Sequence, residues 1–262
     1  MKLCFSTLGC TELGLPGILS LAGRFGIPAI ELRGIGGITE NRLIPEYAPS
    51  RIRGTAELVA ASGKEIAVIG TSCSFDDPSK IETALEEGVF SAAAAERLSC
   101  RYIRVFGNRI RSAASAVHAA SGISRLCRLT APYGVSVLLE VHGDFNTEAA
   151  LAPVIAAQAE KGLANFGLIW DIAHTDGTFG DGWPVFYERF RPYIKHVHIK
   201  DRHRGSGLLC LPGEGDLPAA QIARQLASDG FSGCVSLEWE RRWHPELPPL
   251  EEALPLFTAL CG

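Results

Sequence analysis

Four side chains suited to metal binding stand at or near the ends of four successive apolar segments in the second half of the chain. They are Glu140 in VSVLLE, Asp171 in FGLIWD, His198 in IKHVHIKD and Glu238 in CVSLEWE. Three carboxylates and one imidazole suit a hard or borderline divalent cation, Mn²⁺ or Mg²⁺ first, with Co²⁺ or Zn²⁺ as alternatives. We therefore expect one metal site where the four segments meet. The alternative is four ordinary strands that end in polar residues because they reach solvent.

The order of side chains within these segments supports the metal site. Successive side chains on a strand point to opposite faces. In VSVLLEVH, the valines share one face with Leu139, whereas Glu140 and His142 lie on the other; in KHVHIK, His198 and Lys200 likewise oppose the aliphatic residues. An apolar face towards helices and a polar face inward are typical of α/β barrel strands near the catalytic end. The pattern thus predicts that the polar residues point into one barrel mouth.

The whole chain alternates between strand-like and helix-like segments. Its 262 residues match the roughly 250 residues of an α/β fold built as a single (β/α)8 TIM barrel, so residues 1–262 are expected to form one domain. No G-x-G-x-x-G motif follows the first strand, as an open dinucleotide-binding sheet would usually require. The expected strands are 2–7, 29–33, 65–71, 101–107, 135–141, 166–172, 195–200 and 234–240, and the expected helical segments are 16–26, 49–63, 78–99, 111–134, 147–162, 183–193, 217–230 and 249–260.

Several helix boundaries are marked by capping residues. Asp77 precedes Pro78, which is typical of a cap followed by proline in the first turn, and Asn146 or Thr147 can cap the next long helix. Four glycines are placed where helices should end, at Gly63, Gly134, Gly162 and Gly230.

Composition narrows the class of protein. The net charge of −4 gives no reason to expect binding to nucleic acid or to an anionic membrane, and 47% hydrophobic residues support a large core without a membrane-spanning stretch. The eight cysteines form no C-x-x-C pair, which favours reduced, mostly buried thiols in a cytoplasmic protein. The segment LGLPGILSLAG is interpreted as structure rather than as a signal peptide. The expected partner is a small sugar or polyol, and a homo-oligomer is possible.

The motifs LLEVHGD, WDIAH, HVHIKD with the following LPGEGDLP, and SLEWE resemble those of the sugar isomerase and epimerase barrels. This superfamily is similar to xylose isomerase in fold, and the motifs are most similar to those of single-metal ketose 3-epimerases and inosose dehydratase-like enzymes. The resemblance covers nearly the whole chain. It implies that Glu140, Asp171, His198 and Glu238 bind the metal, and that His174 and Arg204 contact the substrate.

The resemblance also implies a reaction. The cation would chelate a carbonyl and a neighbouring hydroxyl oxygen, so that a proton leaves the adjacent carbon through a metal-bound enediolate. Glu140 and Glu238 are the candidate base and acid. Returning the proton to the opposite face of the same carbon gives an epimerase, and returning it to the neighbouring carbon gives an isomerase.

One position departs from the ketose 3-epimerases. Where they often carry another glutamate, HGDFNTE places Asn146, and His142 could bind a substrate oxygen instead or be a structural histidine. Glu31 lies at a strand end that the family often uses for substrate contact, although an ion pair with Arg33 is the alternative. Lys200 could orient an anionic substrate group or be solvated.

Other functions remain open at this stage. A dehydratase of the inosose or 3-dehydroshikimate type would use the same ligands but expel a hydroxyl group as water. A more remote alternative is a phosphodiesterase similar to abasic-site endonucleases, since KDRH places Asp201 and His203 one residue apart. That site needs histidines at the third and fourth strand ends, where the chain has TSCSFD and VFGNR. A non-catalytic barrel would not be expected to keep all four ligand types.

Overall fold

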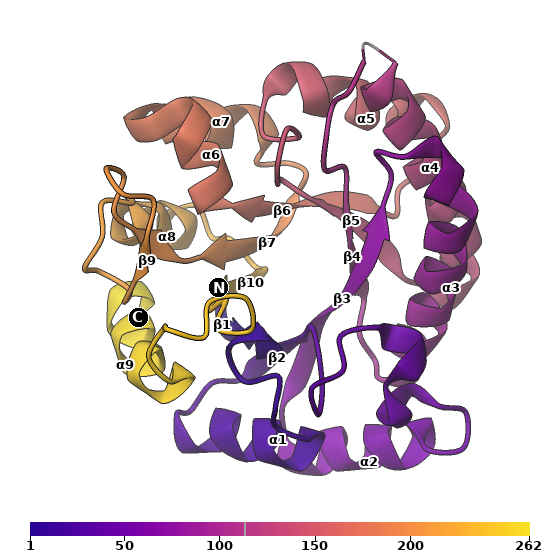
Figure 1. The fold of residues 1–262 in the computed structure, drawn as a ribbon. Helices are drawn as coiled ribbons and strands as arrows, with labels where there is room; N and C mark the ends of the chain where they lie inside the picture. The colour runs from indigo at the N-terminus through magenta and orange to yellow at the C-terminus, as the bar shows by residue number, and fades with distance from the viewer. Residues whose placement is uncertain (113) are drawn as a thin grey trace.

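A closed barrel of eight parallel strands forms the centre of the molecule, in a computed structural model that describes residues 1–112 and 114–262 (Figure 1). Around the barrel the strand order is β1-β10-β7-β6-β5-β4-β3-β2, and β2 pairs with β1 to close it. This confirms the predicted fold class. The strands are β1 Lys2–Ser6, β2 Ala29–Leu32, β3 Glu65–Ser74, β4 Tyr102–Phe106, β5 Ser136–Glu140, β6 Phe166–Asp171, β7 Ile194–Ile199 and β10 Cys234–Leu237.

Helices surround the barrel on all sides (Figure 1). They are α1 Leu15–Arg24, α2 Ile52–Ser62, α3 Ile81–Arg97, α4 Ser115–Thr130, α5 Glu148–Glu160, α6 Ile172–Phe179, α7 Trp183–Phe190, α8 Ala219–Ser228 and α9 Leu250–Cys261. Two features were not expected from the sequence. Helix α6 begins directly after β6, and a short antiparallel hairpin, β8 Asp201–Arg202 with β9 Leu209–Cys210, follows β7.

The capping residues act largely as the sequence indicates. Asp77 accepts a hydrogen bond from the Ser79 amide and caps the 3-10 turn Pro78–Lys80 that leads into α3. Of the two candidates at the next helix, Thr147 is the cap, because its hydroxyl accepts from the Ala150 amide. Gly63 ends α2 in the left-handed conformation, with φ of 66°.

Two apolar layers hold the barrel in shape. The larger one packs the outer faces of the strands against the helices. The smaller one contains Val68, Leu138 and Ile169. Because Leu138 and Ile169 precede Glu140 and Asp171 by two residues, they share the inner face with them. They therefore fill the barrel interior directly below the polar residues at the strand ends.

The loop after β7 is fixed by one buried carboxylate. Oδ1 of Asp201 accepts from the amides of Arg202 at 2.9 Å and Leu217 at 3.2 Å, and Oδ2 accepts from those of Gly213 at 2.9 Å and Gly215 at 3.1 Å. The side chain is only 1% exposed. The loop is therefore anchored to the end of the barrel before α8 begins.

All eight cysteines lie within the described part of the chain, where each is unpaired and six are buried. Burial raises the pKa of Cys73 and Cys127 to about 12, which makes these thiols poor nucleophiles. The mostly buried thiols expected from the sequence are thus confirmed. No helix in the described ranges combines the length and apolar character that crossing a bilayer requires.

Candidate metal centre

The four predicted metal ligands come together at one end of the barrel. One ligand atom from each of Glu140, Asp171, His198 and Glu238 lies within 4.8 Å of the others. The first three end or nearly end β5, β6 and β7, and Glu238 directly follows β10. All four side chains are buried. Carboxylate oxygens and one imidazole nitrogen at this spacing form a donor set that a divalent cation can bridge.

The ring of His198 is oriented for ligation through Nδ1. This buried atom has no hydrogen-bond partner among the described residues and lies 3.5 Å from Oε1 of Glu140 and 3.5 Å from Oε1 of Glu238. On the other side of the ring, Nε2 lies 2.9 Å from Oε2 of Glu31. A proton on Nε2 would be held by Glu31, which leaves the lone pair of Nδ1 free for a cation. The residues therefore fit a metal ion.

Glu31 lies against the back of this ring. Its Oε2 also lies 2.8 Å from Nε2 of His196, and its side chain is fully buried. Burial alone would raise the pKa of Glu31, but the imidazoles of His198 and His196 outweigh this and lower it far below its usual range. The sequence indicated a substrate contact or an ion pair with Arg33 at this position. The structure instead gives Glu31 two histidine partners.

Lys200 lies among the carboxylates. Its Nζ is 2.8 Å from Oδ2 of Asp171 and 2.7 Å from Oε2 of Glu238, and it also pairs with Glu240. The side chain is buried rather than solvated. Burial acts to lower the pKa of Lys200, yet the three carboxylates raise it well above its ordinary value. A positive charge therefore already stands beside the ligand cluster.

Arg104 of β4 holds Glu140 from the opposite side. Its Nη1 donates to Oε2 of Glu140 at 2.8 Å, and both side chains are 2% exposed. Burial would raise the pKa of Glu140, but Arg104 outweighs it and lowers the pKa to about 2. Strand parity is the sequence signal for Arg104, because it points inward from β4. Glu240 could have been found in the same way, two residues after Glu238.

Two histidines form a second polar group beside the cluster. The ring centroids of His142 and His174 are 4.0 Å apart, and the Nε2 atom of His174 is 4.0 Å from Oδ2 of Asp171. Burial is the main cause that lowers the pKa of His174, so its imidazole is neutral at pH 7. Asn146, at the position that departs from the epimerase pattern, donates to the main-chain oxygen of His174 at 3.2 Å.

Asp171 performs two tasks at the start of α6. Its Oδ1 accepts hydrogen bonds from the amides of Ala173 at 2.8 Å and His174 at 3.2 Å, which makes it the N-cap of the helix. Its Oδ2 faces Lys200 and belongs to the ligand cluster. The spacing of three residues in WDIAH thus places His174 in the first helical turn, beside the cluster.

Arg204 is directed at other acidic residues. Its Nη2 donates to Asp176 at 2.7 Å and to Asp181 at 2.9 Å, and Nε also bonds to Asp176. These bonds join the hairpin loop after β7 to α6 and the turn that follows it. The structure therefore shows Arg204 as an inter-loop contact, and the role in substrate binding implied by its position stays a prediction.

The strand ends of this closed barrel gather three carboxylates and a histidine, a donor set that fits a divalent cation. Residues 19–260 match the sequence profile described as the xylose isomerase-like TIM barrel, and the chain belongs to this family. No curated protein sequence gives a significant match.

Solved structures with the same fold include enzymes of two reaction classes. The probable 3-DHS dehydratase AsbF from Bacillus anthracis has a TM-score of 0.79 at 20% identity, over 98% of this chain and 99% of that one. The IOLI protein with a bound zinc atom has a TM-score of 0.78 at 21% identity, over 99% and 96%. The 3-keto-D-glucoside 4-epimerase YcjR from E. coli has a TM-score of 0.75 at 18% identity, over 99% and 98%. At these identities the likeness shows the fold.

Proposed function

We propose that this protein is a divalent-metal-dependent isomerase or epimerase that moves a proton next to the carbonyl of a ketose or related polyol. The observation that carries the proposal is the four-ligand cluster, in which the buried Nδ1 of His198 has no hydrogen-bond partner in the described chain and faces two glutamates. The epimerase among the structures of the same fold supports this class of reaction.

Four residues would hold the ion, namely Glu140, Asp171, His198 and Glu238. When bound, Mn²⁺ or Mg²⁺, with Co²⁺ or Zn²⁺ as alternatives, would supply positive charge to the carbonyl and adjacent hydroxyl oxygens of the substrate. The zinc atom in the IOLI structure supports a cation in a barrel of this fold.

Glu140 and Glu238 would act as the proton-transfer pair. They come from β5 and from the end of β10, which are three strands apart in the ring, and their Oε1 atoms flank Nδ1 of His198. A substrate carbon between them would present one face to each carboxylate. Removal of a proton by one glutamate and its return by the other would invert the centre. Return to the neighbouring carbon would move the carbonyl.

The charges around this pair keep both carboxylates ionised. The Oε2 atom of Glu140 is bound by Arg104 at 2.8 Å and that of Glu238 by Lys200 at 2.7 Å. Burial opposes ionisation of Glu238, yet Lys200 and His198 outweigh it and lower its pKa well below the usual value. Both glutamates are therefore ionised in the resting site.

A dehydratase is the second candidate, and the pair of imidazoles favours it. Loss of water needs a group that protonates the leaving hydroxyl, and two ionised glutamates lack that proton. His142 and His174 lie beside the cluster with ring centroids 4.0 Å apart, and Lys200 lies 2.8 Å from Asp171. A neutral imidazole such as that of His174 could donate a ring N–H hydrogen bond to the leaving hydroxyl, and His142 and Lys200 are the other candidates for this contact. The probable dehydratase of the same fold supports this alternative.

The test is proton exchange followed by NMR in D₂O. The Mn²⁺-loaded protein is incubated with free and phosphorylated ketoses, inosose and 3-dehydroshikimate, beside a sample stripped with a chelator. Metal-dependent deuterium incorporation next to the carbonyl, without loss of water, is the result expected for an isomerase or epimerase. Loss of water would favour the dehydratase. If the protein is shown to hold metal and neither deuterium incorporation nor loss of water is observed, both proposals are wrong.

A pair of variants makes this test specific. Glu238→Gln, with bound metal measured separately, is expected to slow exchange by about 10²-fold or more, as loss of a positioned acid–base group does. Glu57→Gln removes an exposed glutamate of α2 and should leave exchange unchanged. Normal turnover by metal-loaded Glu238→Gln would contradict the assigned role.

A further inference from the structure

Two guanidinium side chains meet at the β2–β4 side of the barrel mouth. Arg33 directly follows β2, Arg104 lies in β4, and Gly70 of β3 stands between them. A Cβ atom added to Gly70 would lie 2.5 Å from Cδ of Arg33 and 2.9 Å from Nη2 of Arg104. Both arginines are buried, at 8% and 2% exposure. Two like charges therefore share one corner beside the metal cluster.

Arg33 has no ion pair in the described part of the chain. Its Nη1 donates to the main-chain oxygen of Thr39 at 2.9 Å and its Nη2 to the hydroxyl of Ser72 at 3.2 Å, and both acceptors are uncharged. The carboxylate of Glu87 accepts from the Ser72 amide instead. Burial and the charge of Arg104 lower the pKa of Arg33 to about 10, so the side chain stays charged at pH 7. A buried charge without a bonded partner is costly, which favours a bound anion.

Arg104 leaves most of its donors unused. A guanidinium carries five N–H groups. Nη1 of Arg104 binds Glu140, whereas its buried Nε and Nη2 atoms have no hydrogen-bond partner among the described residues. These two nitrogens lie along one edge of the guanidinium, and such an edge can hold a carboxylate through two parallel hydrogen bonds. The edge points to a ligand that the protein itself does not supply.

The corner can be approached from the barrel mouth through Arg33. The hydroxyl that holds its Nη2 belongs to Ser72, which is an exposed residue. The free edge of Arg104 is covered in the ligand-free protein, so an anion would meet Arg33 first. Because only two uncharged acceptors hold Arg33, its side chain can turn with the anion into the space above Gly70.

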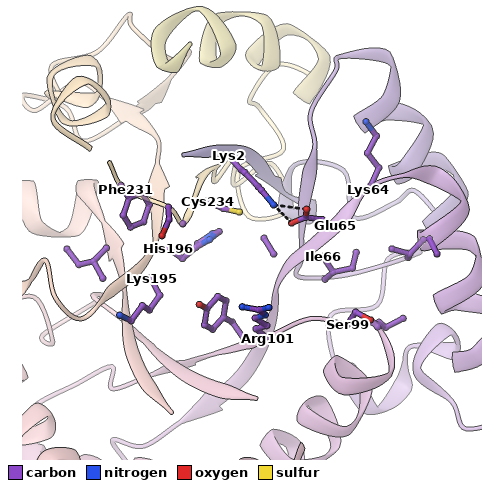
Figure 2. A pocket seen from close by; sticks show the side chains of 18 of the residues that line it. Lys2, Lys64, Glu65, Ile66, Ser99, Arg101, Lys195, His196, Phe231 and Cys234 are labelled. Carbon is purple, nitrogen blue, oxygen red and sulfur yellow. Dashed lines mark hydrogen bonds and ion pairs between the residues drawn. The ribbon is translucent and has the colours of Figure 1, made fainter. Parts of the chain in front are cut away.

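The cations at the other end of the barrel do not converge in this way (Figure 2). A cavity of about 890 Å³ at the starts of the strands is lined by residues that include Lys2, Lys64, Glu65 and Arg101. Lys2 donates to both oxygens of Glu65, at 2.6 Å and 2.7 Å, and the amine of Lys64 points away from Arg101. Convergent positive charge is therefore found at the mouth rather than in this cavity.

The charge and shape of the corner at the mouth suit a carboxylate. Only Arg104 of the two arginines is bonded to an acidic side chain, that of Glu140, so one positive charge lacks a bonded counter-ion. A carboxylate brings one negative charge and two coplanar oxygens, whereas a phosphate monoester brings nearly two charges at pH 7.

We propose that the substrate is a polyhydroxy keto acid whose carboxylate binds between Arg33 and Arg104. This assignment rests on the proposed function, since it takes the barrel mouth as the substrate site. Because Arg104 also binds Glu140, the carboxylate would lie a few bonds from the carbon that exchanges its proton.

Calorimetric titration with matched acidic and neutral compounds tests the proposal. The Mn²⁺-loaded full chain is titrated with D-fructuronate and D-fructose, which differ only in the carboxylate at one end, and with 3-dehydroshikimate and its methyl ester. The acid of at least one pair is expected to bind at least about tenfold more tightly than its neutral partner, because it gains charge-assisted hydrogen bonds. No preference for the acid in either pair would overturn the proposal.

Arg33→Gln makes the test specific, because Arg33 forms no hydrogen bond or ion pair with a predicted metal ligand. The variant should bind the acid at least about tenfold more weakly and the neutral partner within about twofold of the wild type. It loses an unpaired buried charge, so its metal-free form should be no less stable than the wild type. Arg53→Gln removes an exposed arginine of α2 and should change neither affinity.

Bound Mn²⁺ is measured in every sample, so that loss of metal cannot imitate loss of the carboxylate site. A preference for the acid that persists in Arg33→Gln would show that the metal alone holds the carboxylate, and the proposal would be wrong. D-Fructose 6-phosphate is titrated in parallel. Tighter, Arg33-dependent binding of this phosphate than of either acid would also overturn the choice of a carboxylate.

Deuterium exchange on the same samples separates this proposal from the proposed function. Exchange with neutral ketoses and no preference for the acids would leave the proposed function standing and remove the carboxylate site. A preference for an acid that depends on Arg33, without exchange or loss of water in any compound, would support the carboxylate site and remove the proposed function.

Discussion

Nε2 of His198 lies 2.9 Å from Oε2 of Glu31, and this contact fixes which ring nitrogen of His198 faces the other three predicted ligands. The same carboxylate oxygen lies 2.8 Å from His196, so Glu31 is held between two imidazoles. A carboxylate that accepts the proton of a ligating histidine orients the ring and increases the basicity of the other nitrogen. Glu31 therefore has the geometry of a positioning residue.

Glu31→Gln is expected to weaken Mn²⁺ binding by about 10- to 100-fold, because an amide holds the ring of His198 without the negative charge that supports ligation. Calorimetric titration with Mn²⁺ measures this directly, and Glu57→Gln on the exposed face of α2 is the matched control. Unchanged metal affinity together with a raised KM would instead indicate the substrate contact that the sequence predicted for Glu31.

The clustering of the four predicted ligands could be anticipated from the sequence because its signal is local. Strand parity and the position of each residue at or near a strand end are visible in segments of six to eight residues, such as VSVLLE. The partner of His198 could not be predicted, since Glu31 lies 167 residues away and meets it only because β1 and β2 close the ring beside β10 and β7.

Arg204 shows the same limit in a loop. Its contact with Asp176 depends on α6 and on a hairpin whose two strands contain only two residues each, as in Asp201–Arg202. Elements this short leave almost no periodic pattern in a sequence. The barrel and its ligands follow from repeated local patterns, whereas the contacts that orient the ligands depend on the assembled structure.

Lys200→Met is expected to strengthen metal binding, because it removes an ammonium group 2.8 Å from Asp171 and 2.7 Å from Glu238, both predicted ligands. Like charges close together in a buried site oppose each other strongly. The metal-free variant should melt at a lower temperature than the metal-free wild type, since three carboxylates lose their cation. Mn²⁺ should raise the Tm of the variant by more than it raises the Tm of the wild type. An equal or smaller Mn²⁺-induced shift would show that Lys200 does not compete with the metal.

Arg104→Met is expected to destabilise the metal-free protein by about 3–5 kcal/mol, because it leaves the charge of Glu140 buried without its partner. Glu140→Gln introduced together with Arg104→Met should recover part of this loss. Urea unfolding of the wild type, the two single variants and the double variant measures the coupling between the residues. A coupling free energy near zero would show that the 2.8 Å contact contributes nothing to folding.

The same pair gives an expectation for pH. The pKa of Glu140 falls to about 2 in the folded protein, below its value in the unfolded chain, so its ionised form stabilises the fold above about pH 4.5. This stabilisation, about 3 kcal/mol at most, should be lost as the pH falls from about 4.5 to 2. The double variant Arg104→Met with Glu140→Gln lacks the titrating group, and it should lose less stability than the wild type over that range. If the free energies of unfolding of the wild type and the double variant fall in parallel as the pH is lowered, the lowered pKa of Glu140 is wrong.

Gly70→Ala is expected to destabilise the protein by about 1–3 kcal/mol through overpacking of the barrel interior. A Cβ atom there would lie 2.5 Å from Cδ of Arg33 and 2.9 Å from Nη2 of Arg104, so both guanidinium side chains would have to shift. The displacement of Arg104 should also loosen its bond to Glu140. Gly54→Ala on the exposed face of α2 is the matched control, because nothing lies within 4 Å of its added Cβ. Alanine at this position should stabilise the helix by about 0.5–1 kcal/mol. Urea unfolding of both variants separates the two cases. Equal stability of Gly70→Ala and the wild type would mean that the two arginines do not need the space that Gly70 leaves.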